Sequence, residues 1–293
     1  MKSLLAELQN GKVLISDGAW GTLLHKRGLQ IGECPELWNI SHRGDVFAIA
    51  HSYIDAGADI ILTNSFGGSP TKLKHYGLEG RCKELNEAAA DISRTAAGTS
   101  HFVFGSIGPT GVMLMMGEVS EETLYDGFCI QAEALKRGGV DAICIETMSA
   151  IDEACIAIKA ARKSTGLEIA CTFTFDKTIS GEFRTMMGVS PADMVQAVKD
   201  AGASIIGSNC GNGFDQMIDI VKEIRQVDRS IPILVHANAG KPILKEGKTF
   251  FPESPDMMAS KVNDLIESGA NIIGGCCGTT PEHIHAFAKV LKK

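Results

Sequence analysis

Four stretches of this sequence repeat one pattern, and that pattern constrains the fold more than any other feature. They read YIDAGADIILTNS, LKRGGVDAICIET, VKDAGASIIGSNC and LIESGANIIGGCC. Each combines a helix end, a glycine, a short turn and a buried strand, and the glycine suits the left-handed conformation that ends many helices. A unit of this kind, repeated along a chain, predicts parallel strands covered by helices.

Strand-like apolar runs occur throughout the chain, separated by stretches with the period of amphipathic helices. The runs are 12–16, 58–63, 102–107, 140–145, 168–175, 204–208, 232–236 and 271–274. Three helix starts pair a hydroxyl N-cap with proline, at Ser190-Pro191, Ser254-Pro255 and Thr280-Pro281. The alternation predicts an α/β fold, one (β/α)8 TIM barrel over residues 1–293. A doubly wound open sheet is the alternative, but its glycine-rich GxGxxG nucleotide loop is absent.

Charge and cysteine usage narrow the range of partners. The net charge of −7 over 293 residues argues against nucleic acid or an anionic membrane as the main partner. No run of about 18 apolar residues is present, and the N-terminal stretch is too short for a signal peptide, so we expect a cytoplasmic protein. In that reducing compartment the nine cysteines are expected to be buried, catalytic or metal-bound.

Polar and thiol residues recur at one register of the repeat. They follow the repeat glycines by seven and eight residues, as Asn64 and Ser65, Glu146 and Thr147, Asn209 and Cys210, and Cys276 and Cys277. Equivalent positions in equivalent units lie at equal height in a barrel. We therefore expect all of them at the carboxyl ends of the strands, where barrel enzymes place their chemistry.

The cysteines at this register predict a metal site. Cys210 ends the sixth strand, and Cys276 and Cys277 end the eighth, so their backbones are expected about 9–10 Å apart. Three thiolates with one open position are typical of a catalytic zinc. Asn238 at the end of the seventh strand could be a displaceable fourth ligand, and His236 is a rival ligand that should lie deeper. Plain core packing is the alternative, and we expect it for Cys144, Cys155 and Cys171.

Two carboxylates are expected at the same barrel mouth. Asp17 ends the first strand and Glu146 the fourth, and no Lys or Arg occupies an equivalent strand end, so a ligand ammonium would be the partner. Gly18 and Ala19 offer backbone N–H groups to a ligand carboxylate. The alternatives are that Asp17 caps the glycine turn and that Glu146 pairs with Arg184. An ammonium, a carboxylate and a thiol that binds zinc together indicate an amino thiol.

The motifs at these positions resemble the homocysteine S-methyltransferase family over essentially the whole chain. They are DGAWGT at 17–22, SNC at 208–210 and GGCCGTTPEHI at 274–284. FGSIGPTG at 104–111 and NAGKP at 238–242 are most similar to the homocysteine-binding barrel of cobalamin-dependent methionine synthase. The resemblance implies zinc on the three cysteines and homocysteine as the acceptor, methylated to methionine. It also implies the site roles of Asp17, Gly18, Ala19, Glu146 and Asn238, with the first four binding the substrate's amino and carboxylate groups.

The methyl donor is less determined. The resemblance implies a methyl-corrinoid such as methylcobalamin. Because the Asp-x-His-x-x-Gly corrinoid signature is absent, a separate corrinoid protein is expected to carry it. The methionine-rich run GVMLMMGE at 111–118 is either its docking surface or ordinary loop packing. S-methylmethionine and betaine are alternative donors; the betaine-using branch carries tyrosine where Gly68 stands, which disfavours betaine.

Two further readings differ in class. The turn after the eighth strand, leading into the helix start at Thr280-Pro281, could be the phosphate site of a barrel lyase or isomerase. That reading leaves the three cysteines unexplained. A non-enzymatic module that only holds zinc or accepts a corrinoid would share the metal but not the turnover.

Overall fold

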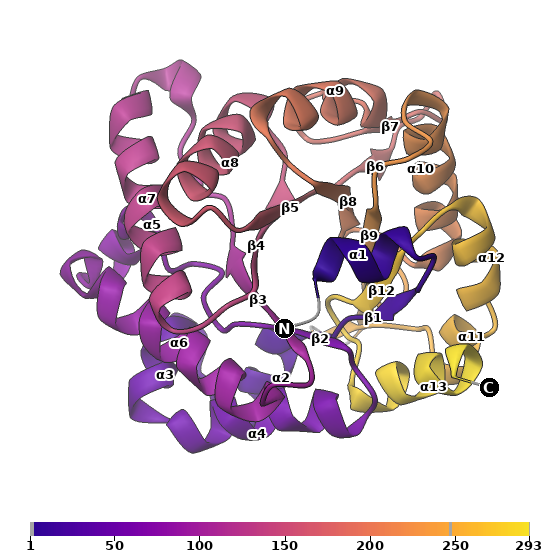
Figure 1. The fold of residues 1–293 in the computed structure, drawn as a ribbon, viewed down its shortest axis with the longest axis horizontal. Coiled ribbons are helices and arrows are strands. Elements are labelled where there is room, and N and C mark those ends of the chain that lie inside the picture. The colour runs from indigo at the N-terminus through magenta and orange to yellow at the C-terminus, as the bar shows by residue number, and fades with distance from the viewer. Residues whose placement is uncertain (1–2, 246–247, 293) are drawn as a thin grey trace.

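A computed structural model describes residues 3–245 and 248–292, and its core is an eight-stranded parallel sheet. In spatial order the strands are β1 (Leu14–Ile15), β12 (Ile272–Gly275), β9 (Ile233–Ala237), β8 (Ile205–Asn209), β5 (Glu168–Phe173), β4 (Ala142–Met148), β3 (Phe102–Ile107) and β2 (Ile60–Leu62). A parallel bridge between Ser16 and Ile60 joins the first strand to the last. The predicted (β/α)8 barrel is confirmed, and Figure 1 shows its ring of helices.

Helices cover the barrel in the predicted alternation. The main ones are α4 (Arg43–Asp55), α6 (Cys82–Ala97), α7 (Glu121–Arg137), α8 (Ile151–Thr165), α9 (Pro191–Ala201), α10 (Phe214–Val227), α12 (Val262–Ser268) and α13 (Pro281–Leu291). The predicted starts at Ser190, Ser254 and Thr280 are confirmed as the N-caps of α9, α11 (Pro255–Ala259) and α13. The four repeat glycines have φ between 100° and 116°, as their helix-ending role requires.

Additional short elements were not predicted. They are α1 (Leu4–Gln9), α2 (Trp20–Lys26), α3 (Trp38–Ser41) and α5 (Pro70–Leu73), together with the hairpins β6–β7 (Asp176–Lys177, Phe183–Arg184) and β10–β11 (Ile243–Lys245, Lys248–Phe250). In Figure 1 α1 is drawn in front of the β9 and β12 side of the ring of strands. Its Leu4 and Leu8 pack against the barrel-interior cluster that contains Leu14 and Cys144, so α1 closes the amino-terminal end.

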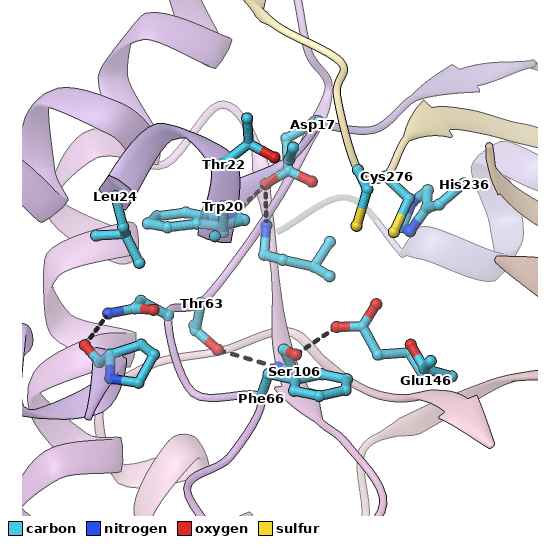
Figure 2. Close-up of a pocket in the computed structure, with 18 of the residues that line it drawn as sticks. Asp17, Trp20, Thr22, Leu24, Thr63, Phe66, Ser106, Glu146, His236 and Cys276 are labelled. Carbon is cyan, nitrogen blue, oxygen red and sulfur yellow. Dashed lines mark hydrogen bonds between the residues drawn. The ribbon is translucent and has the colours of Figure 1, made fainter. Parts of the chain in front are cut away.

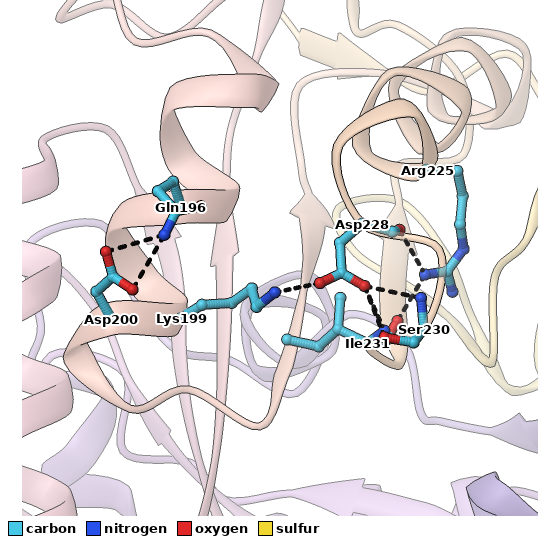
Figure 3. Close-up of polar contacts among 7 residues, drawn as sticks. All are labelled: Gln196, Lys199, Asp200, Arg225, Asp228, Ser230 and Ile231. Carbon is cyan, nitrogen blue, oxygen red and sulfur yellow. Dashed lines mark hydrogen bonds and ion pairs between the residues drawn. The ribbon is translucent and has the colours of Figure 1, made fainter.

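Charged side chains form hydrogen bonds and an ion pair around the segment that leads from α10 into β9 (Figure 3). The Asp228 carboxylate accepts hydrogen bonds from the N–H groups of Ser230 and Ile231, and it pairs with Lys199 of α9. The Arg225 guanidinium donates to the Ile231 carbonyl at 2.7 Å. The hydrogen bonds from Lys199, Ile231 and Ser230 lower the pKa of Asp228 below its usual range, with the Lys199 bond contributing most. The contacts at this end of the barrel therefore stabilise the fold.

Within the described residues, every helix is too short or too polar to cross a bilayer.

Candidate functional site

A cavity of about 290 Å³ opens at the carboxyl ends of the strands, where the register of the repeat predicts it (Figure 2). It is lined by Asp17, Gly18, Ala19, Trp20, Asn64, Ser65, Glu146, Thr147, Cys210, His236, Cys276 and Cys277, among others. The positions aligned by the repeat glycines thus meet around one space, except that Asn209 turns away from it.

The three predicted cysteines come together at one wall of the cavity. The sulfur atoms of Cys210, Cys276 and Cys277 all lie within 4.8 Å of one another. The neighbouring thiols donate hydrogen bonds that hold the pKa of Cys210 well below its usual range. In the described part of the chain this is the one cluster whose side chains could share a metal ion. Mutually close sulfurs with a low-pKa thiolate fit a soft, thiolate-preferring metal such as zinc.

Two adjacent cysteines can face one point because β12 ends just before them. The strand stops at Gly275, and the Cys276 N–H still donates to the Ala237 carbonyl while the chain turns. Gly278 completes the turn with φ 82°. The sixth-strand cysteine also leaves its strand in a left-handed conformation, since Cys210 has φ 62°. Backbone bends on two strands, rather than strand geometry, bring the thiols together.

Asp17 is buried at the seam between β1 and β2. Its Oδ2 accepts from the Trp20 indole N–H at 2.9 Å and from the Leu62 N–H at 2.8 Å. Burial raises the pKa of this carboxyl to about 7 in spite of those bonds. The alternative prediction was that Asp17 caps the glycine turn. This is wrong for Oδ2, because that oxygen bonds the Trp20 indole and the backbone of β2 instead.

Glu146 enters the cavity from β4 and is also buried. Its Oε1 accepts a hydrogen bond from the Ser106 hydroxyl, and burial raises the pKa of the carboxyl to about 7. Pairing with Arg184 is wrong, because that guanidinium contacts Glu182 on its own hairpin. The described residues that line this cavity include neither Lys nor Arg. Two buried carboxyl groups therefore face a space whose described lining offers them no Lys or Arg.

The glycine turn after β1 forms another part of the wall. Gly18 must be glycine, because a Cβ there would lie 2.7 Å from Thr279 Oγ1 and 2.9 Å from the Tyr53 hydroxyl. The Ala19 N–H already donates to Thr279 Oγ1 at 3.1 Å. Of the two predicted backbone donors, Ala19 would thus have to exchange that bond to reach a ligand.

Asn238 and His236 are both buried beside the thiols, on or after β9. The Asn238 side chain contacts Cys210 and helps to lower its pKa, while Asn238 Oδ1 has no hydrogen-bond partner among the described residues. His236 Nε2 is likewise without a partner there, and burial lowers the pKa of this imidazole to about 4. His236 is not part of the cysteine cluster. An orphaned buried amide oxygen next to the thiols fits a weak metal or substrate ligand.

Several residues of the site were missed. The Ser106 hydroxyl contacts Glu146, and the Ser106 N–H donates to Thr63 Oγ1 at 3.0 Å (Figure 2). Ser106 stands inside the FGSIGPTG run, so the motif contained it without indicating its role. The Thr279 hydroxyl accepts a hydrogen bond from the Ala19 N–H. Thr279 stands inside the GGCCGTTPEHI motif, which likewise contained it without indicating its role.

The methionine-rich run lies beside the cavity, at a second hollow. Leu114–Met116 forms a short 3-10 helix, and the side chains of Met115 and Met116 are 77% and 67% exposed. A second hollow of about 430 Å³, which shares Thr147 with the first, is lined by Met113, Leu114 and Met115 together with Met186 and Met187 of the loop after β7. Within the run, Val112 and Leu114 pack against the core, whereas Met115 and Met116 face outward.

Fold and site define a barrel enzyme with a cluster of three thiols at the active end. The chain belongs to the homocysteine S-methyltransferase family, whose profile matches residues 14–291. The predicted enzyme class, a methyltransferase, is confirmed by this membership.

Known relatives agree with this assignment. Methionine synthase of Mycobacterium tuberculosis is 30% identical over 97% of this chain, and that of Mycobacterium leprae is 29% identical over 99%. The chain spans about a quarter of the length of these relatives, 25% in each case. The metallated structure of the homocysteine methyltransferase MmuM from Escherichia coli has the same fold, with a TM-score of 0.80 at 23% identity. The match covers 98% of this chain and 99% of that one.

Proposed function

We propose that this protein is a zinc-dependent S-methyltransferase that converts homocysteine to methionine. One observation carries the proposal: three clustered thiols and two buried carboxyl groups line the same cavity, and its described lining residues include no Lys or Arg. Family membership supports methyl transfer over the lyase or isomerase reading.

Cys210, Cys276 and Cys277 would hold the zinc, with the orphaned Asn238 Oδ1 as a displaceable neighbour. When bound, zinc would lower the pKa of the substrate thiol so that a thiolate is present at neutral pH. The protein itself supplies a preformed ligand set and a partly enclosed space. The substrate thiol would lose its proton to solvent on binding the metal, so the methyl transfer itself would need no general base.

The substrate's amino acid end would lie against the carboxyl groups. Asp17 and Glu146 offer two buried partners to the ammonium, and each must release its proton to pair with it. Ser106 holds one oxygen of Glu146, which leaves the other free for the ligand. Gly18 brings the backbone close, so the substrate carboxylate would meet N–H groups rather than side chains.

The methyl donor we propose is a methyl-corrinoid carried by a separate protein. The similarity to methionine synthases supports it. So do the exposed apolar side chains on the loops after the strands, which include Met115, Met116, Ile179, Met186 and Leu244. S-methylmethionine remains the alternative small donor. Betaine is less favoured, because a Cβ on Gly68 would lie 2.4 Å from Asn86 Oδ1, so the tyrosine of the betaine-using branch has no room here.

The test measures zinc content and methionine formation in the wild type, Cys210→Ala and Cys155→Ala. Cys155 is the matched control, because it is a partly buried cysteine on α8 outside the cavity. We expect one zinc per chain in the wild type and the control, and loss of zinc in Cys210→Ala. Homocysteine is offered with free methylcobalamin, S-methylmethionine or betaine in turn. Zinc retention by Cys210→Ala would contradict the ligand assignment, and turnover only with S-methylmethionine would contradict the corrinoid donor.

A further inference from the structure

Two residues other than glycine have a left-handed backbone in the described part of the chain. They are Thr147 and Cys210, each with φ 62°. This conformation is unusual for any side chain and a genuine outlier for a β-branched one, and it persists only where the surroundings enforce it. Thr147 follows Glu146, and Cys210 is a proposed zinc ligand. The strain thus falls on both ends of the proposed homocysteine site.

At Thr147 the strain belongs to a β-bulge. Ile145 pairs with Cys171 and Met148 with Phe173, so three steps along β4 match two steps along β5. Neighbours in a regular strand point to opposite faces, yet Glu146 and Thr147 both line the cavity. A bulge re-aims a side chain in this way and leaves one residue outside the ladder.

One side chain holds that bulge in place. Asn209 is fully buried at the end of β8, and its amide reaches past β5 to β4. Its Oδ1 accepts from the Thr147 N–H at 2.8 Å and from the Thr172 hydroxyl at 2.7 Å. Its Nδ2 donates to Thr147 Oγ1 at 2.7 Å. The Thr147 N–H that leaves the ladder is therefore satisfied by the residue next to Cys210.

We infer that Asn209 is a positioning residue that sets the separation between the thiol cluster at Cys210 and the carboxylate of Glu146, and thereby selects the length of the amino thiol. The inference rests on the proposed function. A ligand that binds through its sulfur at one end and its ammonium at the other must have a length that matches this separation. Cysteine, shorter than homocysteine by one methylene, cannot reach both ends while Asn209 holds them apart.

The experiment uses the zinc-loaded full chain and the variant Asn209→Leu, which keeps the size of the side chain without its hydrogen bonds. Zinc content is measured against a chelator, and calorimetry gives the dissociation constants of homocysteine and cysteine. We expect zinc to be retained, homocysteine affinity to fall about tenfold or more, and the preference over cysteine to shrink, as a one-methylene selectivity allows. Adding Thr147→Gly should restore part of the preference, because glycine adopts φ near 62° without strain.

Thr172→Val is the matched control: it removes one bond to Asn209 Oδ1 but leaves both bonds to Thr147, so the preference should stay at the wild-type level. If Asn209→Leu does not fold, Thr147→Val removes the acceptor of Asn209 Nδ2 and should change the preference in the same direction. If folded, zinc-loaded Asn209→Leu keeps the wild-type preference for homocysteine over cysteine, the inference is overturned and the proposed function is not. The same holds if the variant loses affinity for both amino thiols equally. A wild type that binds zinc but neither amino thiol overturns the proposed function, and the inference with it.

Discussion

Glu146→Gln should make the empty protein more stable while it weakens homocysteine binding. Burial raises the pKa of Glu146 from its ordinary 4.5 to about 7. A folded-state pKa above the unfolded one means that the bound proton stabilises the fold fully below the unfolded pKa, and that this contribution is lost as pH rises through the folded pKa. At about 1.4 kcal/mol per pKa unit, burial of the Glu146 carboxyl lowers the free energy of unfolding by about 3 kcal/mol at pH 8 and by only about 1 kcal/mol at pH 5.

Glutamine removes that cost because it is neutral and its Oε1 can still accept from Ser106. Urea unfolding without ligand should therefore show an advantage for the variant of about 3 kcal/mol at pH 8, shrinking to about 1 kcal/mol at pH 5. Homocysteine affinity, measured by calorimetry, should fall about tenfold or more, because a charged partner of the ammonium is lost. Glu133→Gln, exposed on α7, is the matched control and should show no such pH dependence. A stability difference that does not grow between pH 5 and pH 8 would refute the reasoning.

Two further predictions concern the scaffold. Asp228→Asn should lower the free energy of unfolding by about 2 kcal/mol at pH 7, because it weakens the Lys199 pair and charge-assisted bonds. The stability from the lowered pKa of Asp228 is fully present above the unfolded pKa and is lost as pH falls through the folded one, so the loss should shrink between about pH 4 and about pH 2; urea unfolding at about pH 7 and about pH 2 checks this. Gly207→Ala should cost about 3 kcal/mol or more in thermal or urea unfolding, because its Cβ would lie 1.8 Å from the Leu234 carbonyl oxygen. Gly80→Ala, with open space around it, should be nearly neutral, and similar losses in both would contradict this account.

The barrel could be predicted because its units are local and repeated. A buried strand needs only a run of apolar residues, and a helix start needs only a hydroxyl followed by proline, so both are visible in a few adjacent letters. The run at 102–107 matches β3 (Phe102–Ile107) at both ends. The run at 140–145 ended three residues before β4 does, at Met148, because the bulge after Ile145 depends on a partner from another strand.

The sequence alone determined which residues stand at the active end. Equal spacing from the repeat glycines aligned Glu146, Cys210, Cys276 and Cys277, and equal height in a closed barrel then made them neighbours. Tertiary structure decided how they face one another. The Asn209 amide holds the left-handed backbone at Thr147, and the Ser106 hydroxyl donates to Glu146. Both contacts join residues at least 40 positions apart. Such contacts arise only when strands close into a barrel, because local periodicity fixes where a residue lies along its strand but not what meets it across the cavity.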